Sequence, residues 1–113
     1  MEESKELYEE KTELLKALSH PLRLQFVRGL LVGGCHNVRC MEAGTGQSQS
    51  TISQHLMRLK AAGVVRCERQ GNEMYYEGSD PDAAAVVAAL FGDKECDYNC
   101  PMTLRSSEAV RQA

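Results

Sequence analysis

The chain has 113 residues, of which 42% are hydrophobic and 26% charged, and its formal net charge is −3. This composition is that of a globular protein of one small domain, and no apolar stretch is long enough to cross a bilayer. The acidic start MEESKELYEEKTELLK lacks the basic and apolar regions of a signal peptide, so we expect a cytoplasmic protein with no membrane partner. A domain of this size gains from a second subunit that covers apolar surface.

Two helices are expected in the first third of the chain. Residues 6–18 place tyrosine and leucine side chains among charged ones at helical spacing. Ser19 is expected to cap a second helix with Pro21 in its first turn, where the missing N–H costs nothing, and His20 is expected to pack or cap. This second helix has a broad apolar face, and the glycine pair at 33 and 34 is expected to end it.

A short helix, a turn and a longer helix are expected next. Residues 35–43 predict two helical turns with Val38 and Met41 facing the core, followed by a turn, GTG, at residues 44–46. Ser48 is expected to cap the longer helix. Apolar residues that recur at i, i+4 and i+7 should face inward from it, namely Ile52, Leu56 and Leu59.

A β-hairpin follows. Gly63 is expected to end the longer helix, because a glycine just past the last periodic residue favours termination. Residues 64–69 and 73–78 are rich in β-branched and aromatic residues, and they flank Gly71 and Asn72, which tolerate positive φ.

The last helix is expected to open at Asp80 and to run to Phe91, with alanine and valine on its apolar side. After Gly92 the periodicity is lost. We therefore expect one domain over residues 1–92 and a cysteine-containing tail over residues 93–113.

The helix that follows Ser48 has an outer face of amides, hydroxyls and arginine, in a segment with a local excess of positive charge. Amides can pair with adenine, arginine with guanine, and hydroxyls with bases or phosphates, while the free N–H groups of a helix N-terminus suit a phosphate. Short helix, turn, polar helix and hairpin predict a mainly α fold with a β-hairpin wing, a winged helix-turn-helix that binds double-stranded DNA. The expected contacts are Ser48, Gln49, Ser50, Thr51, Ser53, Gln54, His55, Arg58, Arg69, Gln70 and Asn72.

Two runs, LKALSHPLRLQFVRGLL and SQSTISQHLMRLKAAGVVRCERQGNEMYY, resemble the ArsR/SmtB family of bacterial repressors. The resemblance implies a homodimer that binds its operator without inducer and releases it on binding a metal, a metalloid or another thiol-directed signal. It also implies dimerisation through the first and last helices, here residues 6–18 and 82–91.

The ligand positions known from the family do not carry over. The resemblance would place an arsenic-type cysteine pair in the short helix, but that stretch reads HNVRC and leaves Cys40 and, further back, Cys35. It would place a zinc-type set of aspartate and histidine along the last helix, which here offers Asp80 and Asp82 and no histidine.

The remaining cysteines suggest a different site. If residues 96–100 continue the last helix, the i, i+4 spacing puts Cys96 and Cys100 on one face. Two thiolates with a third from elsewhere suit As(III) or Sb(III), whereas a closed zinc site normally takes four ligands. We therefore expect arsenite or antimonite as the inducer and no organic cofactor. The candidate ligands are Cys96, Cys100, Cys40 and Cys35.

The alternative uses the same sulfurs without a metal. Cys96 and Cys100 would form a dithiol that closes to a disulfide or polysulfide bridge and so reports oxidant or reactive sulfur. The acidic residues among 93–97 disfavour the thiolates this needs, while Lys94 favours them weakly.

Two cysteines have plainer readings. Cys67 shares strand parity with Val65 and is expected to act as a small hydrophobe in the sheet. Cys40 lies off the face that carries Val38 and Met41, so it could be exposed.

An enzyme is not expected. The chain has no phosphate-cradling glycine loop, and CDYNC lacks the two-residue spacing of a thioredoxin-like pair. The other class is a protein-interaction module without DNA binding. Salt dependence distinguishes the two classes. A protein that neutralises DNA phosphates releases counterions, so its duplex binding depends on salt, whereas an absence of this dependence would favour the interaction module.

Overall fold

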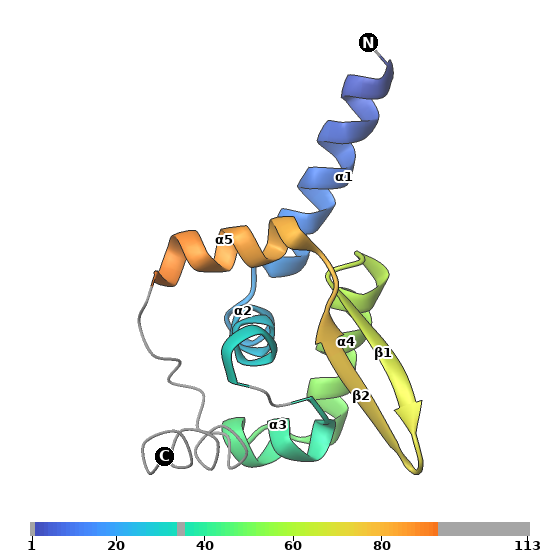
Figure 1. The fold of residues 1–113 in the computed structure, drawn as a ribbon, viewed down its shortest axis with the longest axis vertical. Coiled ribbons are helices and arrows are strands. Elements are labelled where there is room, and N and C mark those ends of the chain that lie inside the picture. The colour runs from blue at the N-terminus through green and yellow to red at the C-terminus, as the bar shows by residue number, and fades with distance from the viewer. Residues whose placement is uncertain (1, 34–35, 93–113) are drawn as a thin grey trace, which may run out of the picture.

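The computed structural model of the protein describes residues 2–33 and 36–92 (Figure 1). The expected tail over residues 93–113 lies outside this range. Within the described residues, no helix is long and apolar enough to cross a membrane. The elements are α1 Glu2–Leu18, α2 Pro21–Arg28, the π-helical turn η1 Gly29–Gly33, α3 Val38–Thr45, α4 Gln49–Ala61, β1 Val65–Gln70, β2 Glu73–Gly78 and α5 Pro81–Phe91.

The helices surround one core, and the hairpin flanks it. α1 projects from the body, α5 lies across the base of α1, the hairpin runs beside α4, and α3 lies at the end opposite α1 (Figure 1). Every α-helix contributes to the core, which confirms a mainly α fold with a β-hairpin wing. The buried apolar residues are Leu14, Ala17, Leu18, Phe26, Val27, Leu30, Cys40, Met41, Ile52, Leu56, Leu59, Val64, Val65, Ala83 and Val87.

The sequence predicts Ser19 as the cap of α2, but the structure has His20 in that position. His20 has an extended backbone, and its Nδ1 accepts a hydrogen bond from the Leu22 amide at 3.1 Å. The Ser19 hydroxyl instead donates to the carbonyl of Leu15 at 2.6 Å. That carbonyl is in the last turn of α1, where helices leave carbonyls short of backbone partners, so Ser19 helps to satisfy the end of one helix while its neighbour caps the next.

The short helix α3 is displaced towards the C-terminus from its expected position. Asn37 caps it by accepting a hydrogen bond from the Cys40 amide at 2.7 Å. The first two residues of the expected turn, Gly44 and Thr45, are helical. The helix ends at Gly46, whose φ of 74° is the left-handed conformation that glycine adopts without strain.

α4 and the hairpin follow the expected pattern closely. The Ser48 hydroxyl accepts a hydrogen bond from the Thr51 amide at 3.2 Å, which confirms this cap. The two strands pair antiparallel, with Cys67 opposite Tyr76. Of the two turn residues, only Gly71 has a positive φ, of 65°. This agrees with the preference for glycine at the first central position of a type II′ turn.

α5 begins with a side-chain cap and ends beside α2. Asp80 caps it by accepting a hydrogen bond from the Asp82 amide at 2.8 Å, as expected. Near its other end, the Arg28 guanidinium lies 4.0 Å from the centre of the Phe91 ring. This cation–π contact joins the end of α2 to the end of α5.

Candidate DNA-binding surface

The outward face of α4 carries polar side chains, as the sequence predicts. Its core face is closed by Ile52, Leu56 and Leu59, all 1% exposed or less. The opposite side presents Gln49, Ser50 and Gln54 to solvent, with Ser48 exposed at the N-terminus and Thr51 and Ser53 half-buried. Amide and hydroxyl groups at the start of an exposed helix are the groups that base edges and phosphates accept.

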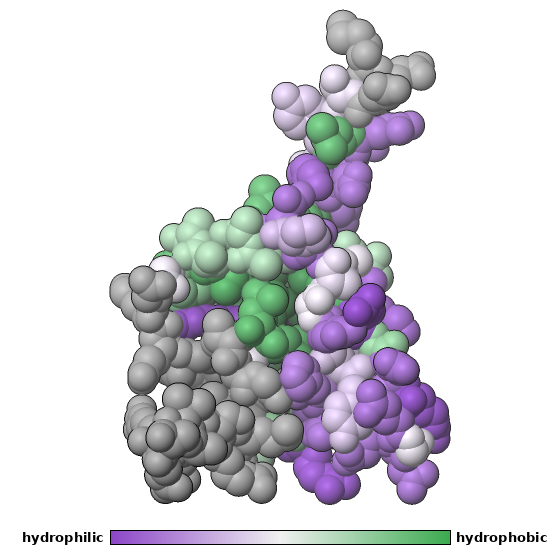
Figure 2. Space-filling model, in the orientation of Figure 1, coloured by the Kyte–Doolittle hydropathy of each residue, from purple (hydrophilic) through white to green (hydrophobic). Residues whose placement is uncertain are grey.

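The wing brings a second set of polar side chains beside α4. Arg69, Gln70 and Asn72 are exposed at the tip of the hairpin. The Arg69 Nε donates to the Gly71 carbonyl at 3.2 Å, which orients the guanidinium along the tip. Hydrophilic side chains gather over this side of the molecule, in contrast to the apolar surface around α5 (Figure 2).

A groove separates the recognition helix α4 from the wing. It has a volume of about 370 Å³ and is bounded by the first turns of α3 and α4 and by β2. Gln49, Ser53 and Asn72, all expected to contact DNA, line it. Three charged lining residues, Arg39, Glu42 and Glu73, were not foreseen. Placing Arg39 required knowing that Asn37 caps α3, because this cap turns Arg39 away from the core.

His55 is turned towards α2 and not to the outward side of α4. Its ring lies 4.4 Å from that of His20 and 6.3 Å from that of Phe26, centre to centre. Arg23 donates to its Nδ1 at 3.4 Å. Three residues after the buried Ile52, His55 falls on the flank of the core face. The structure therefore separates it from the other expected DNA-contacting residues of α4.

Burial lowers the pKa of His55 below its usual 6.5, and the nearby His20 and Arg23 lower it further. All three effects disfavour the protonated ring. The hydrogen bond from Arg23 also needs a neutral Nδ1 with a free lone pair.

Arg58 is half-buried and already has a partner. Its guanidinium lies 3.5 Å from a carboxylate oxygen of Glu13 in α1. A DNA phosphate would have to compete with this carboxylate. Exposed pairs of this kind contribute at most about 1 kcal/mol, so the competition is not costly.

Of the two cysteines in the described residues, Cys67 lies in the sheet as expected, whereas Cys40 differs from its expectation. Cys67 is a free thiol, half-buried in the sheet opposite Tyr76, where burial and then Cys67 raise the pKa of the tyrosine. Cys40 is only 6% exposed, so the expectation that it could be exposed is wrong. The two-turn helix α3 packs against α4, and Cys40 joins the same core cluster as Met41.

Cys40 is also disulfide-bonded. The other cysteine in residues 2–33 and 36–92, Cys67, is a free thiol. Cys35, Cys96 and Cys100, the other expected metal ligands, are outside the described residues. No group of three or more His, Cys, Asp or Glu side chains within the described ranges could hold a metal ion.

A short helix, a turn, a second helix with a polar outer face and a flanking hairpin define a winged helix-turn-helix protein. The comparisons agree with this class. The sequence profile of the arsR family of bacterial regulatory proteins matches residues 20–66. The transcriptional repressor PagR of Bacillus anthracis is 35% identical over 82 residues, which are 73% of this chain and 82% of PagR.

Solved structures give the same result. The transcriptional repressor BigR from Xylella fastidiosa superposes with a TM-score of 0.69 and 35% identity, over 80% of this chain and 91% of BigR. Reduced HlyU from Vibrio cholerae has a TM-score of 0.68 and 25% identity, over 80% of this chain and 94% of HlyU. The protein belongs to the ArsR/SmtB family of winged helix-turn-helix transcriptional repressors, a class of DNA-binding regulators and not of enzymes.

The lowered pKa of His55 predicts loss of stability in acid. Above pH 6.5 the ring is neutral in both the folded and unfolded chain, whereas below it the unfolded chain binds the proton first. The melting temperature should therefore fall as the pH is lowered from 6.5 through the folded-state pKa. His55→Gln should reduce this dependence, and Gln54→Ala, an exposed change on the same helix, should leave it as in the wild type. An equal pH dependence in His55→Gln and the wild type would show that His55 is not responsible.

Proposed function

We propose that the protein is a homodimeric, cytoplasmic repressor that reads operator DNA with α4 and the wing and releases it when its cysteines react with a thiol-directed signal. The observation that carries the DNA-reading part is the juxtaposition of an outward polar face on α4 with an exposed polar wing tip across an open groove. A helix of this kind enters the major groove of DNA with its N-terminal residues at the base edges, and the wing lies along the neighbouring sugar–phosphate backbone of the DNA.

Individual side chains have distinct parts in this docking. Gln49 and Gln54 can each form two hydrogen bonds with an adenine edge. The N–H groups at the start of α4 favour a phosphate, since Ser48 satisfies only one of them. Arg69 at the wing tip can contact the backbone or the minor groove.

Apolar surface on α1 and α5 supports the dimer. Tyr8 is 74% exposed, Leu7 53%, Leu15 52% and Leu90 59%. The outer part of α1 extends beyond the body of the domain, and none of the other described helices and strands lies beside it (Figure 1). A second copy that covers α1 and α5 would bury these side chains and place two copies of α4 on successive major grooves.

The disulfide of Cys40 supports control by thiols. In the reducing cytoplasm a structural disulfide is rare, so one that forms there usually acts as a switch. Closing it removes two electrons and two protons from two thiols, and an oxidant such as a peroxide or a polysulfide accepts them. Cys40 lies in α3, directly ahead of the recognition helix, so the bond can change the position of α4. We propose an oxidant or reactive sulfur species as the signal.

Arsenite or antimonite is the second candidate, and the same observation favours it. Two sulfurs that approach closely enough to form a disulfide can also bind one As(III) or Sb(III) when reduced. Cys40 would be one ligand, with the others drawn from Cys35, Cys96 and Cys100. No organic cofactor is needed in either case.

Two substitutions test DNA reading. Gln54→Ala should weaken operator binding by about 1–3 kcal/mol while leaving unrelated DNA unaffected, because it removes a base contact. Arg69→Ala should weaken both kinds of DNA and lower the slope of log affinity against log salt by about 0.9. Lys5→Ala, an exposed change on α1, serves as the control, and fluorescence anisotropy measures all three. Unchanged affinity in both test variants would contradict the docking.

The dimer is tested by charge on the exposed apolar residues. Leu15→Glu and Leu90→Glu should each dissociate the dimer at micromolar concentration while the chain stays folded, because both side chains are exposed in one copy. Met57→Glu is the control, since Met57 is 70% exposed but lies on α4. Sedimentation velocity measures the result. A monomeric wild type, or dissociation only in the control, would refute this interface.

The signal is tested with Cys40→Ala. Under anaerobic, reducing conditions this variant should bind operator DNA as the wild type does, since alanine fits the site of a small buried side chain. It should fail to release DNA on addition of polysulfide, peroxide or arsenite. Cys67→Ala should respond normally.

The wild type separates the two candidate signals. Release by polysulfide or peroxide that is reversed by a dithiol reductant supports the disulfide switch. Release by stoichiometric arsenite in fully reduced protein supports the metalloid. Wild-type protein that keeps its DNA in the presence of all three would contradict thiol control.

A further inference from the structure

Arg39 lies in the groove between the recognition helix and the wing, although it belongs to neither. It is in the first turn of α3, directly after the Asn37 cap, and its side chain is 83% exposed. Gln49, Ser53 and Asn72 line the same groove from α4 and the wing tip. Arg39 thus faces the place where the operator backbone must pass if α4 and the wing bind DNA together.

The charge in the groove depends on this residue. Arg39 is the only lysine or arginine among the residues that line it, whereas Glu42 and Glu73 both contribute carboxylates. Without the guanidinium, the groove would repel a phosphate backbone. Arg39 is therefore what makes the groove compatible with DNA.

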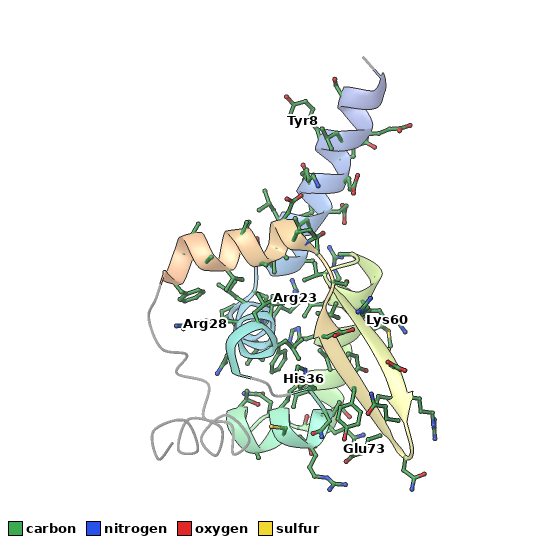
Figure 3. All side chains as sticks on the ribbon, viewed as in Figure 1. Tyr8, Arg23, Arg28, His36, Lys60 and Glu73 are labelled. Atoms are coloured by element: carbon green, nitrogen blue, oxygen red, sulfur yellow. The ribbon has the colours of Figure 1, made fainter. Side chains whose placement is uncertain are left out.

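Glu73 positions the guanidinium in the free protein. A terminal nitrogen of Arg39 lies 3.3 Å from Oε1 of Glu73, while Oε2 of Glu73 accepts a hydrogen bond from the Tyr75 hydroxyl at 3.0 Å. Glu73 is about one-third exposed and lies at the start of β2, beside the wing tip (Figure 3). The pair has the geometry of an exposed ion pair and contributes little stability, so an incoming phosphate can replace the carboxylate.

Other arginines near α4 are held elsewhere. Arg23 donates to the carbonyls of Ala17 and Lys16 and to His55. Arg58 pairs with Glu13 on the α1 side of α4. Of these three, Arg39 alone lies in the groove and is mostly exposed.

We infer that Arg39 binds a phosphate of the operator strand that runs between α3, the start of α4 and the wing, and that Glu73 holds its guanidinium ready in the free protein. This inference rests on the proposed operator binding and adds a contact from α3. Phosphate is the partner because Arg39 lies off the recognition helix, on the rim of the surface that faces the duplex, where contacts set orientation and not sequence.

Two variants of the pair should change affinity in opposite directions. Arg39→Gln should weaken binding to operator and unrelated duplexes by the same factor, about threefold to tenfold near physiological salt, and lower the salt slope by about 0.9. Glu73→Gln should strengthen both, because it removes the competing carboxylate while the amide still accepts from Tyr75. Arg39→Lys should keep the wild-type salt slope, since it keeps the charge.

A purely structural pair would behave differently. If the ion pair served only to hold the wing against α3, breaking it from either side would weaken binding, and Glu73→Gln would resemble Arg39→Gln. Arg66→Gln is the matched control, because it makes the same substitution and also breaks an ion pair, with Glu77 at the end of the hairpin away from the wing tip. It should leave affinity and slope unchanged.

The measurement is fluorescence anisotropy of the reduced full-length protein at several salt concentrations, with thermal melts to show that each variant is folded. The contact is established if Arg39→Gln lowers the DNA affinity, Glu73→Gln raises it, and the control leaves it unchanged. The inference is overturned if both variants change the DNA affinity in the same direction, or if Arg39→Gln leaves the salt slope unchanged. Wild-type protein that binds no duplex would instead overturn the operator-binding function itself.

Discussion

The burial of one face of α4 is the constraint on which the rest of the structure depends. Ile52, Leu56 and Leu59 are almost completely inaccessible, and they belong to a single core to which every other α-helix also contributes. A helix held by three inward positions cannot rotate without exposing them, at a cost of about 1.5–3 kcal/mol for each side chain. Its polar face is therefore fixed towards solvent, and the recognition surface is rigid before DNA arrives.

The segment before α3 connects this rigid surface to the wing. The Tyr76 amide donates to the His36 carbonyl at 2.7 Å, and Nδ1 of His36 donates to the Tyr76 carbonyl at 2.9 Å. Asn37 forms a β-bridge with Tyr75 and also caps the helix that contains Cys40. The wing, the cysteine and the start of α3 are thus joined by a few hydrogen bonds. The proposed thiol signal and the proposed phosphate contact at Arg39 lie in the same helical turn, so one displacement of α3 would act on both.

Local patterns accounted for the elements and for most of the proposed DNA-reading side chains. The Ser48 cap, the apolar spacing through Leu59 and the left-handed Gly71 each depend on a few neighbouring residues, and each is found in the structure. The predictions were wrong where more than one residue could cap the same helix. Ser19 and His20 could both cap α2, but the Ser19 hydroxyl is bonded to the Leu15 carbonyl of α1 and His20 is the cap. Similarly, the Asn37 cap shifted α3 relative to the expected segment.

The sequence by itself determined the family, the order of the helices and strands and the polar face of α4, because periodicity, caps and turn glycines act over a few residues. Only the tertiary structure decided which side chains meet across elements. It turned His55 towards His20, buried Cys40 beside Met41 and brought Arg39 into one groove with Asn72. These positions depend on how helices distant in the chain pack together, and no spacing within one helix contains that information.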